Sequence, residues 1–131
     1  MYNYFKFLYL FLFIFFCLLQ STISAEEKIK IGLLVPITGT NQDLGKQIVK
    51  TTRMALKDIG SDKIEIYLKD TNSNPNKTLK SAYELKQIGV KIIIGPVFYK
   101  SLSYLSEIED ITFLSLTNKT LELPKNAISA G

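Results

Sequence analysis

Hydroxyl and amide side chains, with one glycine among them, gather in three short segments of this sequence. In chain order the segments contain Thr38, Gly39, Thr40 and Asn41; Tyr99, Ser101 and Ser103; and Thr117, Asn118 and Thr120. Such groups, together with backbone N–H groups at helix starts, can hold a polar or anionic small molecule reversibly without transforming it. The alternative is that each hydroxyl only caps the helix or turn beside it.

This chain lacks residues that usually carry out covalent and acid–base catalysis. There is no His, and Cys17 is the single Cys, so an imidazole base, a Ser/His/Asp triad and a His-ligated metal are all excluded. The serines after residue 100 therefore have no activating base. The acids Glu107, Glu109 and Asp110 cluster at the end of one expected helix, where carboxylates are usually solvated. We expect a protein that is not an enzyme, with no metal site and no cofactor.

The sequence comes close to two patterns of phosphate-binding loops but matches neither. A P-loop has four residues between its glycines and then Lys and Ser or Thr, whereas five residues separate Gly39 from Gly45, and Lys46 is followed by Gln47. The glycine pattern of a dinucleotide fold is also missing, although Asp70 stands where its ribose-binding acid would be. We expect Asp70 to bond the turn that follows it instead.

Composition places the chain among globular proteins. Hydrophobic residues make up 47% and charged residues 21% of the sequence. The net charge of 16 − 12 = +4 is spread along the chain rather than gathered in a basic block. No nucleic-acid partner is therefore expected.

Four segments rich in apolar residues predict the strands that position the three polar segments. They cover residues 28–36, 63–69, 90–94 and 111–116. The first ends as a continuous apolar run, which is typical of a strand buried on both faces of a sheet.

Three helices are predicted between these strands. In the first, the recurring positions are Leu44, Ile48, Thr51, Ala55 and Ile59, with Gly60 as the stop. In the second, Asn74 caps a helix that begins at Pro75, and the expected buried face is Leu79, Ala82, Tyr83 and Ile88. The third covers residues 101–108, with Leu102, Leu105 and Ile108 on one side.

The alternation of strands and helices predicts an α/β fold, a doubly wound parallel sheet with helices on both faces. Ligands of such sheets sit beyond the carboxyl ends of the strands, which is where the polar segments fall. Residues 126–131 resemble the start of a fifth strand, and natural domains avoid an open sheet edge. We therefore expect a longer protein, of which residues 26–131 are the front part.

The first 25 residues are expected to be a signal peptide. Residues 7–19 are an unbroken apolar run after Lys6, and Ser24 and Ala25 supply small residues for cleavage after Ala25. A helix of this length spans roughly 20 Å, less than the bilayer core of ~30 Å, although an uncleaved anchor is the alternative. Because Cys17 lacks a small residue before it, lipidation is not expected. A periplasmic location follows from cleavage.

The strand and loop sequences resemble a known family in their order and spacing. The segments IKIGLLVPITGTNQDLGKQIVKTTRMALKDI, IEIYLKDTNSNP, KIIIGPVF and ITFLSLTN are similar to the N-terminal lobe of type I periplasmic solute-binding proteins, the leucine/isoleucine/valine-binding class. The resemblance implies two α/β lobes joined by a hinge, which close on a small polar ligand such as an amino acid. It also implies a membrane permease of an ABC transporter as the partner.

One segment departs from the amino-acid binders. They place Ser or Thr shortly after the glycine of the third strand, where this chain has Pro96, Val97, Phe98, Tyr99 and Lys100. This form is closer to a sister group, the activators of penicillin-binding proteins, whose partner is a cell-wall synthase. Carried over by position, the residues that would face the cleft are Thr38, Gly39, Leu44, Tyr99, Ser101, Thr117 and Asn118. Thr117 is expected to be a surface hydroxyl. The alternative to a cleft-facing Tyr99 is that Phe98 or Tyr99 packs over the end of the third strand.

Overall fold

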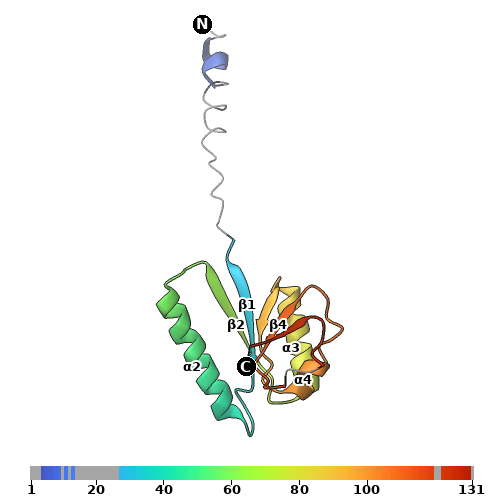
Figure 1. Ribbon diagram of the computed structural model, residues 1–131. Coiled ribbons are helices and arrows are strands. Elements are labelled where there is room, and N and C mark those ends of the chain that lie inside the picture. Colours follow the sequence, from blue (N-terminus) through green and yellow to red (C-terminus); the bar gives the residue numbers. More distant parts are fainter. Residues whose placement is uncertain (1–3, 10, 12, 14–26, 120–121, 131) are drawn as a thin grey trace.

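The computed structural model describes residues 4–9, 11, 13, 27–119 and 122–130 of the 131. Its centre is one parallel sheet of five strands in the order β2-β1-β3-β4-β5 (Figure 1). The strands are β1 (Ile29–Val35), β2 (Ile64–Asp70), β3 (Ile92–Ile94), β4 (Thr112–Ser115) and β5 (Ala127–Ser129). All five lie inside or within one residue of the predicted apolar runs or the predicted fifth strand, so the fold class is confirmed.

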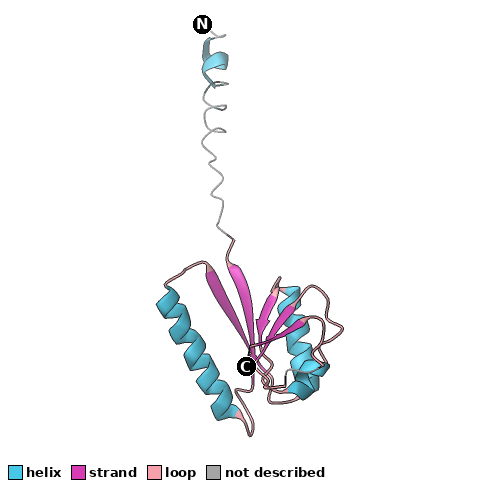
Figure 2. Ribbon diagram, in the orientation of Figure 1, coloured by secondary structure: helices cyan, strands magenta, loops and turns pink. Residues whose placement is uncertain are grey.

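The helices lie on both faces of the sheet. Figure 2 shows α2 (Gln42–Ile59) on one face and α3 (Pro75–Gln87) and α4 (Tyr99–Ser103) on the other. The third helix is shorter than predicted, because the chain turns from Tyr104 onward, yet Leu102, Leu105 and Ile108 are all buried as expected.

Little of the predicted leader lies in the described part of the chain. Residues 4–9, 11 and 13 are helical. The rest of the apolar run 7–19 and the cleavage point after Ala25 lie outside the described residues. Among the residues that are described, no helix has both the length and the apolar character needed to span a bilayer.

Strand β1 is central because its sequence is apolar on both faces. Leu33, Leu34 and Val35 are at most 1% exposed. Leu34 joins the main core with Ile93 and Phe113, on the side of α3 and α4. Leu33 lies on the other side, under α2. A strand with two covered faces needs a helix on each, and the doubly wound fold supplies them.

Helix α2 contacts the sheet through a different stripe from the one marked by the sequence. Leu44, Thr51, Ala55 and Ile59 are exposed, and Ile48 is half-buried. The sheet-facing positions are Gly45, Val49, Thr52 and Leu56, each one residue after a predicted one. Helical spacing therefore predicted the helix correctly but not the side that the sheet covers.

The buried face of α3 also differs in part from the prediction. Tyr83 and Ile88 are 46% and 40% exposed, whereas Ala82 is fully buried and Leu79 packs against the core. The unpredicted members of the buried face are Thr78, Ser81 and Leu85. Tyr83 and Ile88 are largely apolar, but an apolar residue type alone does not require full burial, and both side chains remain partly in water.

The start of α3 is capped as predicted. The Asn74 side chain accepts a hydrogen bond from the Lys77 backbone N–H at 3.0 Å, and Pro75 occupies the first helical position. We expect Asn74→Ala to lower the free energy of unfolding by about 1 kcal/mol, the usual worth of such a cap. Urea unfolding followed by circular dichroism measures it, with exposed Asn76→Ala as the control. Equal stabilities of the two variants would contradict the capping role.

The α2 side of strands β3 to β5 is only partly covered. Register places Ile94, Leu114 and Ile128 side by side in one row on that face. Ile128 is 57% exposed, whereas Ile93 and Phe113 on the opposite face are fully buried. The core of the described chain therefore lies between the sheet and the pair α3 and α4.

Candidate functional site

The carboxyl ends of the strands all lie at one edge of the sheet, at the lower end in Figure 1. The strand order changes direction between β1 and β3, since β1 connects outward to β2 while β3 continues to β4. Such a switch point separates the loops on its two sides and opens a crevice, where doubly wound sheets bind their ligands. Here the flanking loops are residues 36–41 and 95–98, and residues 116–119 follow the next strand.

Asp70 organises the β1 side of this edge. Its Oδ1 accepts hydrogen bonds from the backbone N–H groups of Ile37 at 2.9 Å, Thr38 at 3.2 Å and Asn72 at 2.9 Å. Its Oδ2 accepts from the Thr38 hydroxyl and from Lys77 Nζ, each at 2.6 Å. The bond to Asn72 confirms the predicted turn. The other bonds were not predicted, and they tie the loop after β1 to the start of α3.

The Asp70 carboxylate is ionised over the whole ordinary pH range. Burial alone would raise its pKa, but the hydrogen bonds from Lys77 and Thr38, with those from Asn72 and Ile37, hold the pKa well below its usual range. The negative charge is therefore a permanent part of the edge. It is already satisfied by five donors, so Asp70 positions the loop rather than offering a free acceptor to a ligand.

The loop after β1 is further locked to the turn after β2. Asn41 Nδ2 donates to Ser73 Oγ at 3.0 Å, and Gly39, at a φ of 81°, packs directly against Asn72. A Cβ at Gly39 would collide with the Asn72 side-chain oxygen. Of the polar groups predicted here, the Thr38 hydroxyl is thus engaged with Asp70, while the exposed backbone of Gly39 remains open to solvent.

Gly45, six residues after Gly39, lies at a position that has no room for a side chain. A Cβ at Gly45 would overlap the carbonyl oxygen of Pro36. The first turn of α2 therefore lies directly on the end of β1, and only glycine permits that approach. Leu44, in the same turn, is 42% exposed and stands at the strand-end edge as predicted.

Tyr99 and Ser101 lie at the start of α4, after β3. The Tyr99 hydroxyl donates to the Glu122 carbonyl at 3.3 Å, its ring packs against the core, and Lys119 Nζ lies 3.8 Å from the ring centre. Desolvation would lower the pKa of Lys119, but its bonds to Tyr99 and Glu122 raise it. Tyr99 therefore packs over the strand end, the alternative that the sequence left open. Ser101 is only 2% exposed.

Thr117 and Asn118 follow β4, and they differ in exposure. Asn118 is exposed, but Thr117 is only 4% exposed, so the expectation of a surface hydroxyl was wrong. The Thr117 hydroxyl oxygen accepts from the Lys119 backbone N–H at 3.3 Å, which shapes the turn. The backbone bond from Leu116 N–H to the Pro96 carbonyl at 3.1 Å joins this turn to the loop after β3.

The edge as a whole offers backbone groups and small polar side chains. Thr38, Gly39, Leu44 and Asn118 are exposed there, Tyr99 is half-buried, and Ser101 and Thr117 are buried. In the described part of the chain, no three acidic or Cys residues come together in a way that could hold a metal ion. Such an edge can bind a ligand by hydrogen bonds without transforming it.

Comparison with known proteins gives the chain its family. The family model described as "Periplasmic binding protein" matches residues 28–123, from the start of β1 to the loop after β4. The chain belongs to the periplasmic binding protein family. A curated relative, Leu/Ile/Val-binding protein homolog 1 of Brucella abortus (strain 2308), is 33% identical over 78 residues, which cover 55% of this chain and 21% of the relative.

Two solved structures share the arrangement of the strands and helices. The solute binding protein of an ABC transporter from Rhodopseudomonas palustris BisB5, in complex with 3,4-dihydroxybenzoic acid, aligns with a TM-score of 0.65 and 28% identity over 69% of this chain and 27% of that one. The C-domain of LpoA from Haemophilus influenzae, a regulator of PBP1A, aligns with a TM-score of 0.56 and 28% identity over 66% and 27%. The type I fold and the position of this chain in the N-terminal lobe are thereby confirmed.

This chain spans about a fifth of the length of its curated relatives, 21%. The part that the family model matches contains β1 to β4, the helices between them and the strand-end edge. The family is one of binding proteins, and the solved structures that resemble this chain include both a transport component and a regulator.

Proposed function

We propose that this chain contributes one side of a ligand-binding cleft in an extracytoplasmic solute-binding protein, whose partner is the permease of an ABC-type uptake system. The observation that carries the proposal is the edge at the β1/β3 switch point, where a rigid loop held by Asp70 faces the loop after β3. Its exposed backbone and amide groups suit a small polar ligand such as an amino acid. The leader of residues 1–25 would deliver the protein to the periplasm.

Within the cleft, we propose that the ligand site is built by Thr38, Gly39, Leu44, Tyr99, Ser101, Thr117 and Asn118. We assign these residues different roles. Gly39 and Asn118 are exposed and can contact a ligand directly. Thr38 and Thr117 shape their loops through their own hydrogen bonds, so they act by positioning backbone groups.

Thermal unfolding in the presence of candidate ligands tests the proposal. A ligand that binds only the folded protein raises the melting temperature, by an amount that grows with its concentration above Kd. The panel contains the twenty amino acids and small aromatic acids such as benzoate, each at millimolar concentration. We expect at least one to raise the melting temperature, and no shift with any of them would count against a solute-binding role.

Thr117→Ala tests whether the turn after β4 contributes to ligand binding. We expect the variant to bind the stabilising ligand about tenfold more weakly, as the loss of one hydrogen bond from a displaced backbone group, worth about 1.4 kcal/mol, would give. Because Thr117 is buried, we also expect a loss of about 1 kcal/mol of stability. Thr112→Ala, at the opposite end of β4 and exposed, is the control. Unchanged affinity in Thr117→Ala would remove this turn from the site.

A regulatory role is the second candidate, and the segment Gly95-Pro96-Val97-Phe98 favours it. Tyr99 and Lys119 close over the strand end there, in the segment where amino-acid binders have the Ser or Thr that holds the ligand. In this case the partner is a cell-wall synthase, and the contact is with protein rather than solute. Affinity capture of envelope synthases by the immobilised chain tests this alternative, and a synthase retained without any ligand-induced thermal shift would favour it over transport.

A further inference from the structure

A groove of about 480 Å³ lies between α2 and β2, and at Ile37 it reaches the loop after β1. Its lining residues are Ile37, Lys46, Val49, Lys50, Arg53, Met54, Lys57 and Leu68. Half of these are apolar and half are cationic, and no acidic residue lines the groove. Neither the fold nor the proposed ligand site gives this combination a role.

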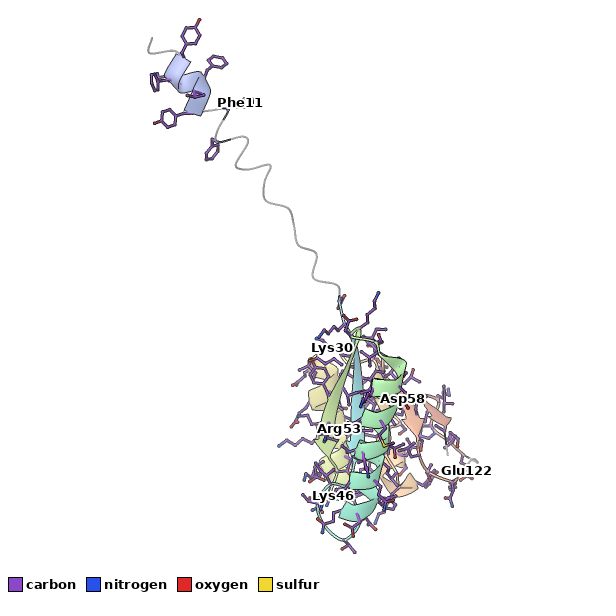
Figure 3. All side chains as sticks on the ribbon, turned by 90° about the vertical axis from the view of Figure 1, so that its left-hand side faces the viewer. Phe11, Lys30, Lys46, Arg53, Asp58 and Glu122 are labelled. Carbon is purple, nitrogen blue, oxygen red and sulfur yellow. The ribbon has the colours of Figure 1, made fainter. Side chains whose placement is uncertain are left out.

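The four cations form one stripe along α2. Lys46, Lys50, Arg53 and Lys57 are separated by four, three and four residues, so they lie on the same flank of the helix. All four are exposed, and within the described part of the chain their side chains make a single hydrogen bond, from Lys46 Nζ to the Gln42 side chain. Figure 3 views this flank from outside, with Lys46 and Arg53 along α2. The stripe is therefore a positively charged surface, without neutralising partners among the described residues, and it lies beside the apolar residues that line the groove.

The other wall of the groove is a free strand edge. Strand β2 stands at one end of the sheet order, and among the described strands it pairs with β1 alone. Thr71 N–H donates to Val35, and the Lys63 carbonyl accepts from Ile29. In a parallel pair alternate residues bond the neighbour, so the odd-numbered residues of β2 face β1. The backbone groups of Ile66 and Leu68 therefore point outward, beside the groove.

From this juxtaposition we infer that the groove is a docking site for an extended acidic segment of a partner protein. The segment adds a strand to β2 through the outward backbone groups of Ile66 and Leu68. Every second residue of it is acidic and reaches the cations of α2. The apolar residues Ile37, Val49 and Leu68 on the floor of the groove lower the local dielectric beside these ion pairs and strengthen them.

An anionic membrane surface fits the same cations less well. Asp43 and Asp58 also lie exposed on α2, and neither of them lines the groove. By helical spacing they flank Met54 on the outermost face of the helix, which a flat surface would touch first. A narrow strand reaches the cations without meeting these two carboxylates. The observations therefore favour a peptide.

Fluorescence anisotropy with a labelled octapeptide of alternating Val and Glu tests this inference on the intact chain. We expect saturable binding that weakens with added salt. The double variant Lys50→Gln/Arg53→Gln should bind about tenfold more weakly, the effect of losing two partly exposed ion pairs. Lys80→Gln/Lys91→Gln removes the same charge from exposed positions outside the groove, and its affinity should stay within about twofold of the parent. Circular dichroism checks that both variants fold.

Three further probes decide how the segment binds. The same octapeptide with alternate amides N-methylated keeps its charge but cannot pair with a strand edge, so it should not bind. Equal binding of this peptide, of an alternating Val and Lys octapeptide, or of the Lys50→Gln/Arg53→Gln variant would overturn the inference. Sedimentation with vesicles of phosphatidylglycerol and phosphatidylcholine in equal parts, in the absence of peptide binding, would replace it with a membrane contact.

Discussion

Replacement of Gly95 by Ala should remove about 3 kcal/mol or more of the free energy of unfolding, the sum of backbone strain and steric overlap. Gly95 has a φ of 106°, which L residues rarely adopt, and a Cβ there would collide with the backbone carbonyl of Leu34. The overlap is with main-chain atoms of the central strand β1, so no side chain can move aside. The measurement is urea unfolding followed by circular dichroism.

Gly89→Ala is the matched control for this effect. Gly89 also has a positive φ, 85°, but a Cβ added there would meet no other atom within 4 Å, so only the strain of about 1 kcal/mol applies. The difference between the two variants isolates the close approach of the β3 end to β1. If Gly95→Ala and Gly89→Ala lost the same stability, the packing of the loop after β3 against β1 would be different from the one described.

Asp70→Asn should lower the free energy of unfolding by about 2 to 3 kcal/mol, as expected for hydrogen bonds to a charged group. The variant removes the charge that Lys77 faces and turns one acceptor oxygen into a donor that meets N–H groups or the Thr38 hydroxyl. Glu107→Gln, at an exposed position of the same charge, is the control and should change stability by less than about 0.5 kcal/mol. Equal stability of the parent and Asp70→Asn would contradict the organising role of this carboxylate.

The pH dependence of the same pair gives an independent test. The pKa of Asp70 is lower in the folded protein than in the unfolded chain, so its contribution is fully present above the unfolded pKa of about 4. That contribution is lost as the pH falls from there toward the folded pKa. The stability difference between the parent and Asp70→Asn should thus stay constant from about pH 7 to 5 and shrink below about pH 4. A constant difference down to the acid limit would mean that Asp70 is not preferentially ionised in the folded state.

The strands and their parallel pairing could be predicted, because strands that alternate with helices along the chain must pair in parallel through right-handed crossovers. Which face of each helix is buried could not be predicted in the same way. Leu44 and Ala55 form a regular apolar stripe on α2, yet the sheet touches Gly45 and Leu56, one residue further on. A small residue is needed where the helix approaches Pro36, and the spacing of apolar residues does not contain that requirement.

The candidate site was predictable at the level of its segments but not of its hydrogen bonds. Parallel connections bring the strand ends to one edge, so Thr38, Tyr99 and Thr117 were assigned to the correct edge of the sheet. Their exposure depends on how the loops fold back. Thr117 is buried in a turn that it builds itself, and Thr38 is engaged by Asp70. The pairing of Val35 with Asp70, which sets the second of these contacts, is a matter of register that no local pattern records.

The most direct test of a binding edge at the strand ends is a map of the backbone amides that respond to ligand. The chain is labelled with ¹⁵N and titrated with the compound that gives the largest thermal shift. We expect chemical-shift changes concentrated at residues 37–41, 96–101 and 116–119, with little change at the opposite ends of β1 and β4. Changes confined to the opposite ends of the strands, or spread evenly over the sheet, would contradict a binding edge at this place.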